Sequence, residues 1–305
     1  MNGSTAARTA APPAEAAVLH RHEFEAMAVQ VECVVEAAER PSAAFAAVEA
    51  EFERLEQVFS RFRADSELSQ LNGVGEGQVG ADLYDVVALA LDGRDRTGGR
   101  FDPTVLDAVV AAGYDRTFAA LPADGPPPTA RPCGGTVTLD PATRTVRLGA
   151  GTHLDLGGIA KGYAAERACE RFAGIGPCLV NAGGDVAIAG VPRGGSWPVG
   201  VDVQGVELTL GLAHGGVATS GCDYRRWVRG GREQHHLIDP STGLPSDSDL
   251  VSVTVVASDS VEAEIRAKAL FLAGGRAAVA EADALGLPSV LVARDGRVVR
   301  AGGLA

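Results

Sequence analysis

The chain has 305 residues, of which 46% are hydrophobic and 22% are charged, as in an ordinary globular protein. Its formal net charge of -12 and isoelectric point near 5.0 argue against a general nucleic-acid or anionic-membrane binder, whose main attraction would be a cationic surface. A phosphate-bearing ligand is not excluded, because a few backbone amides and one or two local cations are enough to bind it.

The five cysteines are odd in number and none stands in a C-x-x-C pair, which favours reduced thiols over a disulfide framework or a zinc site. Residues 1–20 are small and Ala-rich without a continuous apolar stretch, so we predict a disordered tail there. No run of 18 apolar residues occurs. We therefore expect a cytoplasmic chain without a membrane anchor, whose folded domain spans residues 21–305.

Regular elements are predicted along the first part of the chain. A β-branched, roughly alternating stretch predicts a first strand at about 27–35. Apolar residues recur at three- and four-residue spacing over 42–62, which predicts an amphipathic helix. A second helix fits 83–97 and ends at two glycines. Residues 121–132 contain five prolines, so a surface loop is expected there.

The second part of the chain is mostly strand, with separated helices. A hairpin is predicted over 136–151, and a short strand then runs through a glycine turn into a helix over 159–172. Further helices fit 260–272 and 276–285, and a closing hairpin turns at Asp295 and the following glycine. Mixed strands with few helices predict an α+β fold rather than a doubly wound parallel sheet.

Several glycine turns could hold a ligand. Residues 155–163 (DLGGIAKGY) place a glycine pair and Lys161 at a predicted helix start, an arrangement that suits an anion and equally suits tight strand–helix packing. The segments 98–104, 181–185, 217–221 and 235–243 are each typical of ordinary turns when taken singly.

Taken together and in this order, the segments resemble the ApbE family, the FAD:protein FMN transferases, along roughly residues 22–300. Seven blocks carry the resemblance: FSRFRADSELSQLN (59–72), GGRFDPTV (98–105), DLGGIAKGYAAER (155–167), NAGGDVAIAG (181–190), VATSG (217–221), HHLIDPSTGLP (235–245) and SVTVVASDSVEAEIRAKAL (252–270).

The resemblance implies an α+β fold with mixed sheets and packed helices, which binds FAD in a cleft with a divalent metal at the diphosphate. Members of the family move the FMN half of FAD onto a threonine of a client protein, in an Asp/Ser-Gly-x-Thr acceptor, and release AMP. Some relatives hydrolyse FAD to FMN and AMP, and others mainly bind flavin, so these two activities stay open as alternatives.

The resemblance also assigns site residues. The expected cofactor-binding residues are Met27, Phe62, Arg100, Phe101, Asp102, Asp155, Lys161, Gly183, Asp185 and Thr219. Met27 is followed by Ala28 and Val29 where the family usually has Gly-Thr, and Phe62 stands where many members have tyrosine. A phenyl ring could still stack on the cofactor, but any contact of the hydroxyl is lost.

The expected metal position departs from the family pattern. The resemblance implies Asp and Thr four residues apart on one helix, together with a backbone carbonyl that matches Gly158, but here the pair is Glu264 and Lys268. Glu264 could still bind Mg²⁺, which prefers oxygen, whereas a protonated Lys268 cannot. Two interpretations follow. Either Lys268 replaces part of the metal's charge at phosphate oxygens, or Glu264 and Lys268 form only an i,i+4 ion pair.

Three residues are expected to take part in the chemistry: His236, Asp239 and Lys268. His236 matches the histidine of the family's H-x-x-D-P segment and Asp239 its aspartate. An unperturbed histidine titrates near physiological pH, so His236 is our candidate for the general base toward a threonine hydroxyl or water. A purely structural histidine at a strand end is the alternative. His235 is expected on the opposite face of the strand and serves as its control.

Overall fold

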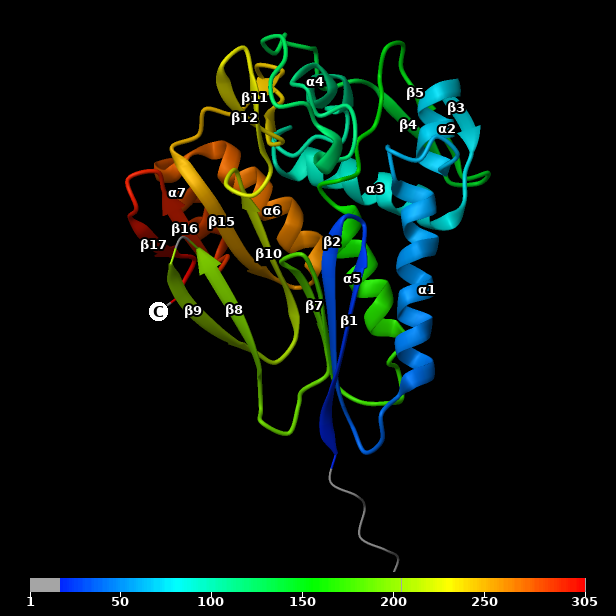
Figure 1. Cartoon of the computed structure of the whole chain (residues 1–305), viewed down its shortest axis with the longest axis vertical. Helices are drawn as coiled ribbons and strands as arrows, with labels where there is room; N and C mark the ends of the chain where they lie inside the picture. Colours follow the sequence, from blue (N-terminus) through cyan, green and yellow to red (C-terminus); the bar gives the residue numbers. More distant parts are fainter. Residues whose placement is uncertain (1–16, 204, 305) are drawn as a thin grey trace, which may run out of the picture.

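The computed structural model describes residues 17–203 and 205–304, which form a large antiparallel sheet with helices on one face (Figure 1). Its strand order is β1-β2-β6-β7-β10-β15-β16-β17, and every neighbouring pair is antiparallel. The strands are β1 Val18–Ala26, β2 Val29–Ala37, β6 Cys178–Ala182, β7 Asp185–Ala189, β10 Gly215–Gly221, β15 Leu250–Ala257, β16 Ser289–Ala293 and β17 Val298–Ala301.

Helices α5 and α6 pack on the sheet beside each other, α1 packs on α5, and α7 packs on α6 (Figure 1). In α1 the buried side chains recur every three or four residues, from Phe45 through Phe52 to Phe59, so the helix has one apolar face. The helices are α1 Ser42–Phe59, α2 Glu67–Val74, α3 Ala81–Arg96, α4 Leu106–Ala111, α5 Ala160–Glu170, α6 Ser260–Ala273 and α7 Gly275–Leu285, with a 3-10 turn at Phe118–Ala120.

The opposite face of the sheet is covered by a two-stranded ribbon, β8 (Trp197–Val203) and β9 (Val206–Leu212). Strand β15 is therefore buried on both sides, which explains its nearly continuous apolar sequence. Three small sheets complete the fold: β3 Glu76–Gln78 with β4 Val137–Asp140 and β5 Thr145–Leu148, β11 Arg226–Arg229 with β12 Arg232–His235, and β13 Ile238–Asp239 with β14 Leu244–Pro245.

The α+β fold class is confirmed, and so are the helices predicted near α1, α3, α5, α6 and α7, the proline-rich loop and the two hairpins. Helix α1 ends at Phe59 rather than residue 62, because Ser60 is already extended. Helices α2 and α4 were not predicted. Among the residues that the structure describes, no helix is long and apolar enough to cross a membrane.

The first predicted strand was wrong at its start. Met27 and Ala28 form the two-residue turn between β1 and β2, and both have positive φ, 50° and 56°. Strand β1 begins at Val18, so residues 18–20 belong to the sheet rather than to the predicted tail, and residues 1–16 lie outside the described part of the chain. Positive φ in two non-glycine residues indicates local strain in this turn.

Candidate active site

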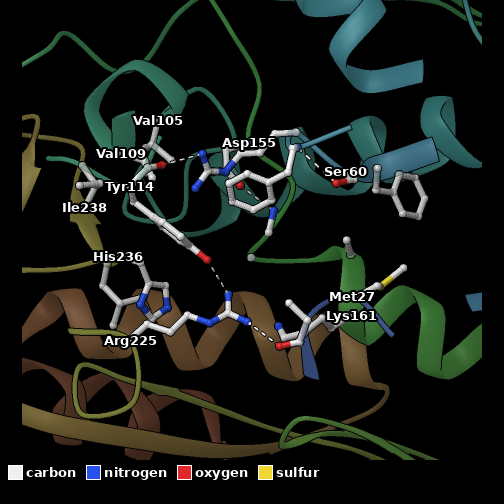
Figure 2. A pocket seen from close by; sticks show the side chains of 18 of the residues that line it. Met27, Ser60, Val105, Val109, Tyr114, Asp155, Lys161, Arg225, His236 and Ile238 are labelled. Atoms are coloured by element: carbon white, nitrogen blue, oxygen red, sulfur yellow. Dashed lines mark hydrogen bonds and ion pairs between the residues drawn. The ribbon is translucent and has the colours of Figure 1, made fainter. Parts of the chain in front are cut away.

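A cavity of about 370 Å³ lies where the β1–β2 turn, the glycine turn before α5, helix α6 and the segment 225–238 meet (Figure 2). Ten of the residues expected from the sequence line it: Met27, Phe62, Arg100, Phe101, Asp102, Asp155, Gly158, Lys161, His236 and Lys268. These residues come from distant parts of the chain, so the fold brings the predicted site together at one place.

Asp155 holds the glycine turn in place. Its carboxylate accepts a hydrogen bond from the Gly157 N–H at 2.7 Å and pairs with Arg61 Nε at 3.0 Å. Its own N–H donates to the Pro103 carbonyl at 2.8 Å. Both side chains of the Asp155–Arg61 pair are largely buried, so this pair fixes the turn against the segment that follows α1.

Lys161, in the first turn of α5, bridges two buried carboxylates. Its Nζ lies 2.5 Å from Asp185 Oδ2 and 2.9 Å from Glu264 Oε1, and the Gly162 N–H donates to Glu264 Oε2 at 3.1 Å. Burial alone would lower the pKa of Lys161, but the two carboxylates outweigh it and raise that pKa above its ordinary value. Burial and the neighbouring Glu264 carboxylate raise the pKa of Asp185. The network ties α5, α6 and β7 together.

Lys268 approaches the glycine turn from α6. A Cβ placed on Gly158 would lie 1.8 Å from Lys268 Nζ, so the ammonium occupies the space above this glycine, and it lies 5.7 Å from the centre of the Phe101 ring. Burial lowers the pKa of Lys268; the Glu264 carboxylate opposes this shift, and nearby Lys161 adds to it. Within the described chain Lys268 has no hydrogen bond or ion pair, and Glu264 pairs with Lys161 instead, so the expected alternative of a Glu264–Lys268 pair is not found.

The residues at the expected metal position do not fit a divalent cation. Both oxygens of Glu264 already accept hydrogen bonds, and the Lys268 ammonium stands over Gly158, whose carbonyl was the other expected ligand. The Lys268 ammonium, which has no ion pair in the described chain, repels a dication at this position. Nor does the described chain contain a group of three or more His, Cys, Asp or Glu side chains that could hold a metal ion.

An aromatic wall faces the glycine turn. The Arg61 guanidinium lies 4.1 Å from the centre of the Phe62 ring and 4.5 Å from that of Tyr114, and Arg61 Nη1 donates to the Tyr114 carbonyl. The rings of Phe62 and Tyr114 are 5.6 Å apart. Phe62 is 37% exposed, so part of its ring remains open to a flat ligand.

The two adjacent histidines have opposite surroundings. His235 is buried, and its ring nitrogens interact with the Ser246 carbonyl at 2.9 Å and the Leu237 N–H at 3.3 Å. His236 lines the cavity (Figure 2), and its buried Nδ1 has no hydrogen-bond partner in the described chain. Burial lowers the pKa of His236 well below 6.5, and the cations Lys268 and Arg225 add to this effect. The imidazole is therefore neutral at pH 7 and able to accept a proton.

Arg225 crosses the cavity next to His236, as Figure 2 shows. Its guanidinium donates to the Tyr114 hydroxyl at 3.4 Å and to the Ala28 carbonyl at 3.5 Å. Both bonds are long, and the guanidinium is partly exposed. Arg225 thus connects the aromatic wall with the strained β1–β2 turn by weak contacts.

Some expected residues make other contacts than those anticipated. The Arg100 guanidinium pairs with Glu281 at 2.7 Å. Asp102 accepts hydrogen bonds from Thr104 and from the Gly134 N–H, so its carboxylate shapes a loop. Asp239 accepts from the Ser241 N–H and hydroxyl inside a turn and does not line the cavity.

Gly183 and Thr219 also lie outside the cavity. Gly183 has a φ of 64°, and a Cβ there would come within 2.7 Å of Val29, so this glycine serves the β6–β7 turn. Thr219 is exposed and its hydroxyl contacts that of Thr254. Its neighbour Ala218 packs against α6, so Thr219 points to the other face of the sheet.

Arg61, Tyr114 and Arg225 are among the lining residues that sequence reasoning missed. Arg61 lies inside the block 59–72, and its place beside an aromatic residue was the available signal. Tyr114 and Arg225 stand in segments without a recognised pattern, and only the fold places them at the cavity.

An α+β domain whose cavity combines an open aromatic ring, two ammonium groups and a neutral histidine has the features of a nucleotide-binding enzyme. Comparison with known proteins makes this more specific. Residues 27–291 match the ApbE family, and the chain belongs to that family.

Two relatives illustrate the similarity in sequence. The FAD:protein FMN transferase of Treponema pallidum is 34% identical over 269 residues, covering 77% of this chain and 74% of the relative. The FAD:protein FMN transferase of Haemophilus influenzae is 28% identical over 268 residues, covering 81% and 77%.

Solved structures agree with the fold. The ApbE protein of Thermotoga maritima has a TM-score of 0.84 at 29% identity, covering 93% of this chain and 97% of that one. The flavin transferase ApbE of Vibrio cholerae has a TM-score of 0.76 at 23% identity, covering 94% and 98%.

Proposed function

We propose that the protein moves FMN from FAD onto a threonine hydroxyl of a client protein and releases AMP. The observation that carries this proposal is a neutral histidine and a cationic glycine turn in one cavity. It occurs in a chain whose relatives are named FAD:protein FMN transferase.

The transfer is a displacement at phosphorus. The threonine oxygen attacks the phosphorus on the FMN side, and the bond from that phosphorus to the bridging oxygen of the diphosphate breaks. FMN becomes esterified to threonine, and AMP leaves with the bridging oxygen. The threonine proton passes to His236, whose ring faces the cavity and is neutral at pH 7.

The walls of the cavity suit the two ends of the substrate. The exposed part of the Phe62 ring can stack on a flat ring system, as the isoalloxazine requires. The glycine turn and Lys268 present N–H groups and a positive charge to the diphosphate between the two halves of FAD. The charge of Lys268 lowers the pKa of His236, and both residues line the cavity. The base and the positive charge therefore act on the same part of the substrate.

The test is incubation of the purified protein with FAD and a peptide that carries an Asp-Gly-x-Thr acceptor. We expect AMP release and a mass gain of one FMN on the peptide, located at the threonine. A peptide with valine in place of that threonine is the matched control and should gain no mass.

AMP release without a mass gain on the peptide would replace the proposal with hydrolysis of FAD to FMN and AMP. Bound FAD without AMP would identify a flavin-binding protein and overturn the transferase. Both outcomes are separated from simple misfolding by measuring FAD binding on the same sample.

A further inference from the structure

Lysine is confined to the cavity. Of the 27 Lys and Arg residues in the chain, only two, Lys161 and Lys268, are lysines, and both line the cavity. The other residues of this set are all arginines. Arginine therefore supplies the cation of surface ion pairs such as Arg297 with Asp295. The chain thus uses arginine for ordinary salt bridges and keeps lysine for one place.

The chemistry of the two side chains explains such a division. The guanidinium is a broad, planar fork, whereas the ammonium is a compact point charge with three donors on a flexible stem. Only the compact charge can stand in the narrow space above Gly158, where the lack of a Cβ leaves room for Lys268 Nζ. A point charge in this position resembles a bound cation more closely than a guanidinium would.

The two lysines have different tasks. Lys161 is committed to Asp185 and Glu264, so its charge is already balanced within the protein. Lys268 has neither an ion pair nor a hydrogen bond in the described chain, although its side chain is partly buried. A partly desolvated ammonium that faces a cavity and has no partner is stabilised by an anionic ligand.

We propose that the Lys268 ammonium takes the place of the divalent cation at the FAD diphosphate, so that this chain binds FAD without metal. The inference rests on the proposed function for its substrate. It follows from three contacts: Lys268 Nζ over Gly158, Glu264 held by Lys161, and Glu264 held by the Gly162 N–H. The carboxylate that would bind a metal instead fixes the neighbouring lysine.

The first test measures the dissociation constant of FAD by flavin fluorescence, in EDTA and in Mg²⁺. We expect the two values to agree within about twofold, since the charge that neutralises the diphosphate belongs to the protein. Tightening by tenfold or more on addition of Mg²⁺ would overturn the inference. Because binding is measured before any turnover, this result does not depend on whether the protein transfers FMN.

The second test compares Lys268→Met with wild type in EDTA. Methionine matches the lysine side chain up to Cε and lacks the ammonium, so FAD should bind about 10- to 100-fold more weakly, the loss of a charge-assisted hydrogen bond. The affinity for riboflavin, which has no phosphate, should stay within about twofold, and this control also reports on folding. Equal weakening for both ligands would assign Lys268 a structural role only and contradict the inference.

The scarcity of lysine allows a direct test of contact. An amine-reactive reagent followed by mass spectrometry can modify only Lys161, Lys268 and the N-terminal amine. FAD should slow modification of Lys268 about tenfold or more, whereas riboflavin should leave the rate unchanged and the N-terminal amine serves as the internal reference. Modification of Lys268 at the same rate with and without saturating FAD would overturn the inference.

The double variant Glu264→Asp/Lys268→Thr restores the pair that the family resemblance implies. We expect its FAD binding to be weak in EDTA and to recover about tenfold or more with Mg²⁺, a dependence that wild type lacks. A double variant that binds FAD equally in both conditions would show that charge at position 268 is not what the diphosphate requires. If binding follows these expectations but no AMP appears, the proposed function fails while the inference about the diphosphate stands.

Discussion

The two sides of the cavity differ in how their charges are held. On the side of α5 and α6, Lys161 lies between Asp185 and Glu264 at 2.5 and 2.9 Å, and every charge of this trio is paired. On the side of segment 225–238, Arg225 makes two bonds of 3.4 and 3.5 Å, and His236 Nδ1 has no partner in the described chain. The first side is a fixed framework, and the second keeps polar atoms free.

The difference indicates that one side of the cavity fixes the geometry of the site and the other supplies the reacting groups. The tightly paired network holds α5, α6 and β7 in one geometry, which pre-organises the position of a diphosphate at the start of α5. Free polar atoms on the other side remain ready for a reacting group that arrives only with the client. Variants of each side should therefore fail in different ways.

The largest effect is expected for His236→Ala. The rate of AMP release under saturating FAD should fall about 10²- to 10⁴-fold, the usual contribution of a general base, while the FAD dissociation constant changes less than about threefold. The matched control is His235→Ala, whose ring contacts Ser246 and Leu237. That variant should lose stability with little change in turnover, and equal turnover losses in both variants would remove His236 from the chemistry.

Lys161→Met should destabilise the side of the cavity that α5 and α6 form. It leaves Asp185 and Glu264 buried without their cation, and removing one partner of a buried ion pair destabilises a protein by about 3–5 kcal/mol. Urea denaturation measures this change. Arg297→Met, which removes an exposed pair with Asp295, is the control and should change the free energy of unfolding by less than about 0.5 kcal/mol. A Lys161→Met protein as stable as wild type would mean that the trio does not hold the framework.

The pH dependence of kcat/KM tests the role of His236 as the general base. Because the pKa of His236 lies below 6.5, the base remains neutral at pH 7, and activity should fall about tenfold per pH unit only once the pH drops below that pKa. Besides burial, the charges of Lys268, Arg225, His235 and Lys161 lower this pKa. His236→Ala should lose this acid limb. A limb centred above pH 6.5, or one that persists in the variant, would contradict the assignment.

The smallest effect is expected at the tip of the β1–β2 ribbon. Ala28→Gly relieves a positive φ of 56° and should stabilise the protein by about 0.5–1 kcal/mol, since relief of backbone strain exceeds the added freedom of the unfolded chain. Arg144→Gly, at φ 53° and outside the cavity lining, is the matched control and should gain a similar amount. A loss of stability in Ala28→Gly alone would mean that the turn is held by contacts of the methyl group.

Much of the fold could be predicted because its signals are local. Periodic apolar residues marked α1, and the turn at Asp295 and Gly296 marked the last hairpin. The β1–β2 turn was missed, because Met27 and Ala28 carry no turn signal and only tertiary contacts hold them at positive φ. One such contact is the hydrogen bond from the Met27 N–H to Glu56 Oε2 at 3.0 Å.

The family resemblance assigned ten of the residues that line the cavity, since its blocks are contiguous in sequence. It could not indicate that Lys161 rather than Lys268 would pair with Glu264, because that choice depends on how α5 approaches α6. Gly162 permits this approach: a Cβ there would come within 2.9 Å of the Ser260 carbonyl. Arg225 was missed for the same reason, as its contacts with Tyr114 and Ala28 exist only in the folded chain.

The position of the cavity also has a consequence for folding. Its lining joins the β1–β2 turn, near the start of the chain, to α6, near the end, and these segments meet only through strands that pair across the whole sheet. Contacts between residues so distant in sequence form slowly, because long loops must close first. The cavity should therefore be complete only in the last stage of folding, so that recovery of flavin binding after dilution from denaturant reports the native state rather than an intermediate.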